Sequence, residues 1–562
     1  MTTVEPASYP DSGGAPRWIV ASLDVKEGRD PLGLQTTTQD RLMPRLLPGV
    51  LELSRRARYL SFHAYMLDKY RELRLPADGG SLSAFLKARE WEYGLAVLNC
   101  PHGCESSPVG AQRLRAMVNH QDPPYPRGES VESAFGGYGL YYRSPLAELG
   151  IVARAGTLLG DTPTTVDVLY NTDRARQLAA TFREAIVGTR YATSWMLTSD
   201  PIPLDVLVEY ADVACLCQLR SRAAERDAVN DALFGSDPVE QRSEAAAAEP
   251  ELHQDADAED ESLSVGAAVI QRRRSFAHYL TLVDAAPAVI DDEGAYRQAM
   301  WAPPGPRSSD HERVAGQWAG LIAKDVWQDA LCSIWSEFCR AGVNRSLEAQ
   351  GEGLSWDTVR EMARTMVDGP PSVPQAMPTL ELVDAIATGG ISLPGMDKPV
   401  AEVPLEELRT ATDELDTATS GLIVILELHR RTHGRSDPGW MLSSNARSAW
   451  QLSLATVLDA ITEHVGTDSS VGDTLWWLTN RFILNVHERI AYSKLPEHTF
   501  RFRWEEGRIR FFNNGVGRFP LAAIRNEPLA SLTSDLDLWR RQSSGEAELT
   551  ALGRAFVEEA LP

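Results

Sequence analysis

The sequence predicts a mainly α-helical, multidomain protein that ends in a small α+β module. Its 562 residues are too many for one hydrophobic core, so several domains are expected. Over most of the chain, apolar residues return every three or four positions, which is the pattern of amphipathic helices. After residue 495 the pattern changes to short alternating stretches interrupted by glycine, and this change predicts strands.

An acidic segment marks the clearest domain boundary. An extended lead-in, residues 1–35, and an N-terminal helical domain, residues 36–236, come before it. In residues 237–262, ten acidic residues stand against the single Arg242. Such a stretch has almost no apolar surface to bury, so we expect a disordered linker or an acidic insertion.

A central helical block is expected over residues 263–367. Its strongest signal is an apolar stripe at helical spacing, typical of a helix that faces a core, formed by Trp318, Leu321, Ile322, Trp327, Leu331, Trp335 and Phe338. Cys332 and Cys339 share a face of this helix and should be buried with it. A Pro/Gly-rich break, residues 368–378, then leads to a third helical block, residues 379–495.

The C-terminal module, residues 496–562, begins with a predicted hairpin. The stretch TFRFRWEEGRIRFF alternates on both sides of Glu506-Gly507, which favours two strands joined by a tight turn. LASLTSDLDLW then predicts a helix, and Thr550 is a candidate N-cap for ELTALGRAFVEEAL. This order, with the pattern DLxLW followed by LTxxGR, resembles the closing part of winged-helix domains. That resemblance implies a module that contacts protein or DNA.

Composition limits the function classes. A net charge of −23 argues against salt-driven binding of nucleic acid over the whole surface, although it leaves room for a local basic patch. Arginine far outnumbers lysine, as is common in proteins of GC-rich bacterial genomes. The chain opens with a polar stretch, and no apolar run approaches the ~20 residues that cross a bilayer. We therefore expect a cytoplasmic protein with no membrane partner.

Six cysteines raise the question of a metal site. Cys100, His102 and Cys104 in NCPHGC have a spacing that invites metal binding, but a tetrahedral zinc site needs four ligands. The nearest additional cysteines, Cys215 and Cys217 in ACLCQL, lie on what the pattern predicts as an apolar helix that would point them apart. We therefore expect buried or structural thiols, no bound metal and no cofactor. The sequence does not decide whether NCPHGC itself binds metal.

Two similar stretches each start a predicted helix with arginines. RRARYLSFHAY contains Arg55, Arg56 and Arg58, and RRRSFAHYL contains Arg272, Arg273 and Arg274. Guanidinium groups at a helix start can grip a phosphate, which would make these six residues candidates for nucleic-acid or anion binding. The alternative is that they are solvated or form ion pairs within an acidic protein.

One catalytic pattern is present. In NRFILNVH, Arg481 and His487 are similar to the R-x4-6-H motif of HEPN ribonucleases. That resemblance implies a metal-independent ribonuclease in which histidine moves a proton and arginine stabilises the phosphorane charge. The loose pattern also fits Arg58 with His63 and Arg273 with His278. On a straight helix Arg481 and His487 would lie about 120° apart, and His487 shares a face with apolar residues, which favours a core histidine.

The segment LGLQTTTQDRLMPRLLPGVLELSRRARYLSF resembles bacterial proteins associated with defence against phage and mobile elements. The resemblance implies a protein that acts with partners encoded nearby in the genome. We therefore expect a non-catalytic scaffold or sensor subunit of a defence assembly, with contact to DNA or RNA left open. The alternatives are the ribonuclease above and a DNA-contacting regulator that uses the C-terminal module and the two arginine clusters.

Overall fold

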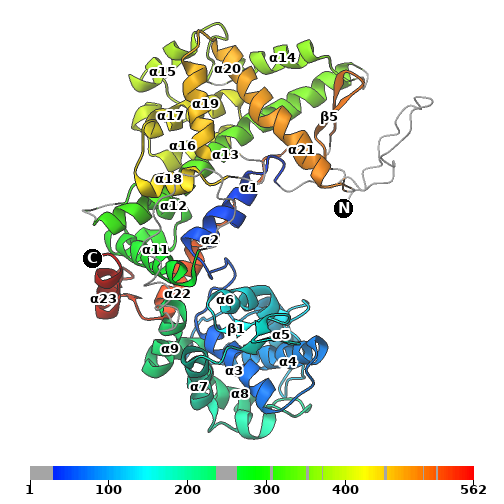
Figure 1. The fold of residues 1–562 in the computed structure, drawn as a ribbon, viewed down its shortest axis with the longest axis vertical. Coiled ribbons are helices and arrows are strands. Elements are labelled where there is room, and N and C mark those ends of the chain that lie inside the picture. The colour runs from blue at the N-terminus through cyan, green and yellow to red at the C-terminus, as the bar shows by residue number, and fades with distance from the viewer. Residues whose placement is uncertain are drawn as a thin grey trace, which may run out of the picture.

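The computed structural model is mainly α-helical, with strands only in small antiparallel pairs among the described residues. The structure describes residues 30–235, 263–303, 305, 308–349, 353–369, 371–447, 452–495, 497, 499–513 and 517–562. Figure 1 shows the N-terminal domain at the bottom, a second helical domain at the top and a middle layer of helices between them. Within the residues that the structure describes, no helix has the length and apolar character needed to span a bilayer.

The N-terminal domain is a helical bundle with two short strand pairs. Its helices are α3 (Arg58–Glu72), α4 (Gly79–Leu98), α5 (Ala111–His120), α6 (Arg143–Glu148), α7 (Asp173–Ile186), α8 (Leu204–Ala214), the 3-10 helix η4 (Leu216–Ser221) and α9 (Ala223–Phe234). The strand pairs are β1 (Val152–Ala153) with β4 (Val168–Leu169), and β2 (Leu158–Leu159) with β3 (Thr162–Pro163). Helix α3 lies in this bundle and is buried from Arg58 to Leu67 and again at Tyr70.

Helix α13 (Ser309–Glu348) joins the middle layer to the second domain. Its 40 residues make a rod about 60 Å long. Residues up to Ile322 belong to the first hydrophobic core, and Ala323 to Cys339 belong to the second. The predicted stripe from Trp318 to Phe338 is buried, as are Cys332 and Cys339, so this prediction is confirmed.

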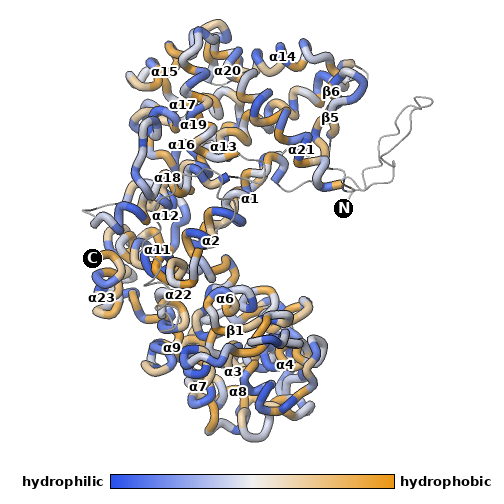
Figure 2. Tube along the Cα trace, in the orientation of Figure 1, coloured by the Kyte–Doolittle hydropathy of each residue, from blue (hydrophilic) through white to orange (hydrophobic). Residues whose placement is uncertain are grey.

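The second domain packs around the C-terminal half of α13. Its helices are α14 (Trp356–Thr365), α15 (Thr379–Ala387), α16 (Leu405–Leu415), α17 (Ala418–Thr432), α18 (Pro438–Ser444), α19 (Leu454–Val465), α20 (Val471–Leu478) and α21 (Asn485–Ser493). Glycines allow close crossings: a Cβ at Gly439 would overlap the carbonyl oxygen of Arg313 on α13. Figure 2 shows hydrophobic and hydrophilic residues alternating along most helices, as expected where one face meets a core.

The predicted C-terminal module is divided between the two cores. The hairpin β5 (Phe502–Glu505) with β6 (Arg508–Phe511) turns at Glu506-Gly507, as predicted, and contributes Phe502, Ile509 and Phe511 to the second core. The remainder comprises α22 (Asn526–Asp535), β7 (Trp539–Arg541), β8 (Ala547–Leu549) and α23 (Ala551–Ala560), and it packs into the first core. Residues 496–562 therefore do not form one compact unit.

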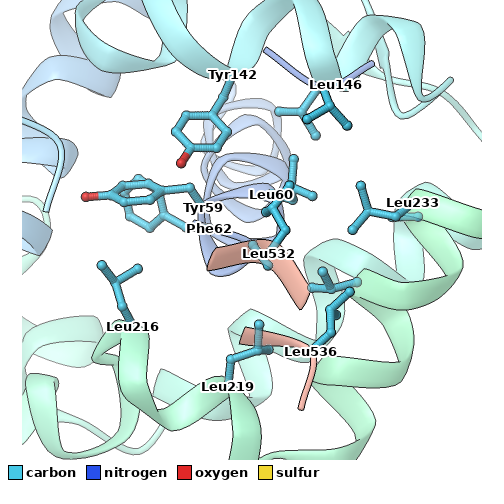
Figure 3. Packing of buried hydrophobic residues seen from close by; sticks show 14 of the residues in the cluster. Tyr59, Leu60, Phe62, Tyr142, Leu146, Leu216, Leu219, Leu233, Leu532 and Leu536 are labelled. Atoms are coloured by element: carbon cyan, nitrogen blue, oxygen red, sulfur yellow. The ribbon is translucent and has the colours of Figure 1, made fainter. Parts of the chain in front are cut away.

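The middle layer completes the first core. It contains α2 (Met43–Leu46), α11 (Val265–Ala285) and α12 (Glu293–Trp301), together with α22 and α23. The short helix α1 (Leu34–Thr36) instead contributes Leu34 to the second core. Figure 3 shows Leu532 of α22, and Leu536 directly after this helix, in the same cluster as side chains of α3, α6, η4 and α9. The C-terminal end of the chain thus packs on the N-terminal domain.

The observed cores differ from the predicted domain boundaries. The predicted central block, residues 263–367, has no core of its own because α11 and α12 belong to the first core and most of α13 to the second. The break at 368–378 does separate two helical segments. The whole of the predicted acidic linker and most of the predicted lead-in fall outside the described residues.

Candidate metal centre

Four cysteines from two distant segments meet in the N-terminal domain. Cys100 and Cys104 lie in the loop that follows α4, where Gly103 at φ +62° turns the chain back. Cys215 lies directly after α8, and Cys217 lies in η4. The four sulfur atoms lie within 4.8 Å of one another, and this is the group of potential metal ligands found among the described residues.

The sulfur separations match a tetrahedral metal site. The Sγ atoms of Cys104 and Cys215 are 3.4 Å apart, and those of Cys100 and Cys217 are 3.7 Å apart. Zn–S bonds of about 2.3 Å give sulfur–sulfur edges of about 3.8 Å in a tetrahedron, whereas a disulfide bond is about 2.05 Å long. All four cysteines are free thiols in the structure. The arrangement therefore suits a metal ion at the centre of the four sulfurs.

The expectation that Cys215 and Cys217 would point apart is wrong. It assumed one continuous helix, but α8 ends at Ala214. Cys215 has an extended backbone with φ −57° and ψ 146°, and a tighter 3-10 helix starts at the next residue. This break brings both sulfurs to the same side of the turn.

His102 stays outside the sulfur cluster. Its Nε2 atom lies 3.1 Å from the carbonyl oxygen of Asp212 and 3.2 Å from that residue's Oδ1 atom. The imidazole thus links the NCPHGC loop to α8, and the third and fourth sulfur ligands come from Cys215 and Cys217.

The thiols of this group differ in pKa because they are buried and hydrogen-bond to one another. A hydrogen bond from Cys215 lowers the pKa of Cys217 to about 5 and raises that of Cys215. Burial raises the pKa of Cys100 to about 11. Without a metal, negative charge is therefore favoured on the Cys217 sulfur over those of Cys215 and Cys100, whereas a bound cation would favour thiolates at all four positions.

The six candidate anion-binding arginines are engaged by groups of the same chain. Their partners are Glu52 and Glu527 for Arg55, Asp535 for Arg56, Glu225 for Arg58, the carbonyls of Pro48 and Leu233 for Arg272, Glu559 for Arg273, and Asp310 for Arg274. Arg58 and Arg272 are buried almost completely. This geometry favours ion pairs at five of these positions, and backbone carbonyls at Arg272, over phosphate binding.

Arg481 and His487 have different surroundings. The His487 ring is buried, with Nδ1 3.1 Å from the carbonyl of Pro31 and Nε2 accepting the N–H of Arg501 at 2.9 Å. Burial lowers its pKa to about 3, so the ring is neutral at physiological pH. Arg481 is at the surface, with its guanidinium carbon 5.7 Å from the ring centres of Trp477 and Phe482. The arrangement favours a packed histidine over a proton-transfer group.

The chain has no match among protein-family models, curated proteins or solved structures. Its function is therefore argued from the four-cysteine group and its surroundings.

Proposed function

We propose that the chain is a helical scaffold protein whose N-terminal domain holds a structural zinc ion through Cys100, Cys104, Cys215 and Cys217. The observation that supports this proposal is the convergence of four sulfur atoms at tetrahedral spacing. Soft thiolate ligands in tetrahedral geometry select zinc or iron–sulfur chemistry over magnesium or calcium. Four sulfurs around one central ion suit Zn²⁺.

The proposed site is structural rather than catalytic. A catalytic zinc keeps one coordination position open for water or substrate, and four cysteine ligands close the tetrahedron. The ion would connect the loop after α4 to the turn after α8, two segments that are 111 positions apart. Its role would be to hold these helix ends together.

Metal analysis tests the proposal directly. Protein purified without added chelator should contain one zinc per chain, and a Cys100→Ser/Cys215→Ser double variant should contain none. Cys339→Ala is a matched control because that thiol is buried on α13, away from the group, so its zinc content should equal that of the parent. Four free thiols without stoichiometric metal, or two disulfides within the group, would contradict the proposal.

We further propose that this scaffold works in a bacterial defence assembly with proteins encoded nearby in the genome. Support for this comes from the resemblance of residues 32–62, and from the closed metal site, which suits a structural role. Co-purification with neighbouring gene products and loss of phage resistance on deletion are the expected results. A chain that stays a lone monomer during infection would count against it.

A ribonuclease and a DNA-contacting regulator remain the alternatives. The ribonuclease depends on Arg481 and His487, so an RNA cleavage activity that Arg481→Ala abolishes without unfolding the chain would replace the scaffold proposal. The regulator requires DNA binding that Arg55→Glu weakens. The internal partners of these side chains lead us to expect neither result.

A further inference from the structure

The backbone that ends α8 is held by buried side chains of other helices. A helix normally leaves its last carbonyl groups without partners. Here the guanidinium of Arg58 on α3 donates to the carbonyl oxygens of Val213 and Cys215, at 2.9 and 2.5 Å. The hydroxyl of Tyr93 on α4 donates to the carbonyl oxygen of Ala214 between them, at 2.9 Å. Three consecutive carbonyls are thus fixed where the chain turns towards Cys217.

The Arg58 guanidinium is itself fixed on its other edge. Its Nε and Nη2 atoms donate to the two carboxylate oxygens of Glu225 on α9, at 2.9 and 2.7 Å. The hydroxyl of Ser61 donates to the same carboxylate at 2.8 Å. Both partners of the ion pair are buried, with exposed side-chain fractions of 0% and 1%. The planar group therefore has one orientation, and that orientation aims two donors at the turn.

We propose that Arg58 and Tyr93 are positioning residues for the metal centre. By fixing the carbonyls of residues 213–215, they hold the backbone of Cys215 in its extended conformation and place the sulfurs of Cys215 and Cys217 opposite those of Cys100 and Cys104. The inference rests on the proposed zinc site and concerns what shapes it. Groups behind metal ligands orient them, and their loss typically weakens metal binding.

Lysine cannot replace Arg58 in this role. The guanidinium uses its forked donors to reach a carboxylate and two carbonyls at once, whereas the three donors of lysine all sit on a single nitrogen. An Arg58→Lys variant keeps the positive charge beside Glu225 but loses the fork. Tyr93→Phe is a milder change because it keeps the ring and removes only the hydrogen bond to Ala214.

The experiment measures zinc affinity by competition with a chromophoric chelator, in the full chain. Arg58→Lys should weaken zinc binding on the order of ten- to a hundred-fold, and Tyr93→Phe roughly two- to ten-fold, as for one hydrogen bond. Arg56→Lys is the matched control, since Arg56 lies two residues before the first residue of α3 and binds Asp535 with the same forked pair of donors. Its side chain engages Asp535 rather than the turn after α8, so zinc affinity should be unchanged.

The outcomes separate this inference from the zinc proposal. A parent chain that binds no zinc contradicts the metal site itself. A parent that binds zinc, with affinities equal to those of folded Arg58→Lys and Tyr93→Phe, overturns the positioning role while leaving the site in place. If Arg58→Lys fails to fold, Tyr93→Phe alone decides, because removing one hydroxyl leaves its packing intact. Substitution with Co²⁺ adds a spectrum that reports whether the tetrahedral thiolate geometry survives in each variant.

Discussion

Removing the metal should loosen one defined part of the N-terminal domain. The proposed ion cross-links Cys104 to Cys215, closing a loop of 111 positions that contains α5, α6, α7 and α8. If the link acts as a disulfide does, by restricting the unfolded chain, a loop of this length contributes about 5 kcal/mol. Removing the ion with a strong chelator should therefore lower the free energy of unfolding of this segment by about 5 kcal/mol.

Hydrogen exchange read segment by segment is the suitable assay, because a chain with two cores need not unfold in one step. A loss of about 5 kcal/mol corresponds to exchange faster by between three and four orders of magnitude, at about 1.4 kcal/mol per tenfold, for amides that exchange through opening of this unit. We expect the change in α5, α7 and α8. Helices α17 and α19 of the second core serve as the internal control and should exchange at unchanged rates.

Two results would refute this reasoning. Equal exchange rates in α5, α7 and α8 before and after removal of the zinc would mean that the ion does not stabilise this segment. Equal acceleration in α17 and α19 would mean that chelation acts on the whole chain rather than through the closed loop.

Three further predictions concern other parts of the molecule. Gly439→Ala should destabilise the second domain by about 3 kcal/mol in chemical denaturation, because the added methyl meets the backbone of α13. Gly188→Ala, which has open space at its Cβ position, should be neutral and serves as the control. The stability of the second domain should fall with acid: His487 is neutral in the fold with a pKa of about 3, so its contribution is complete above the unfolded pKa near 6.5 and is lost as pH falls towards 3. Between pH 7 and pH 5 the loss is about 2 kcal/mol, and His487→Gln should remove this part of the pH dependence of the thermal midpoint. Asp535→Asn should release α22 and α23, since its carboxylate holds Arg56 at 2.8 and 2.9 Å; faster hydrogen exchange confined to these two helices is expected, and unchanged protection there would contradict it.

Local patterns predicted local structure well. The stripe along α13 follows from helical periodicity alone, and the hairpin turn follows from Glu506-Gly507, both of which have positive φ in the structure. Thr550 caps α23 as expected, accepting the N–H of Gly553. In each case the residues that determine the structure lie within a few positions of one another.

The metal centre could not be predicted because its cause is not local. Nothing in the sequence around ACLCQL ends a helix at Ala214; the partners that cap the turn are Arg58 and Tyr93, more than a hundred positions away. The arginine clusters mislead for the same reason. Their spacing indicates anion binding, but the carboxylates that engage Arg56 and Arg58 come from distant helices. The one signal in the sequence that could have predicted the site is the presence of two closely spaced cysteine pairs, Cys100 with Cys104 and Cys215 with Cys217, which together offer four ligands.

The return of α22 to the first core has a consequence for synthesis on the ribosome. Domains generally fold from the N-terminus as the chain emerges. Here the apolar surface formed by α3, η4 and α9 is covered only after Leu532 and Leu536 have been synthesised. More than half of the polypeptide is translated during that interval, with an apolar face still open. A zinc ion bound early by the four cysteines, all of which emerge within the first 217 residues, would brace the nascent domain until its last helix arrives.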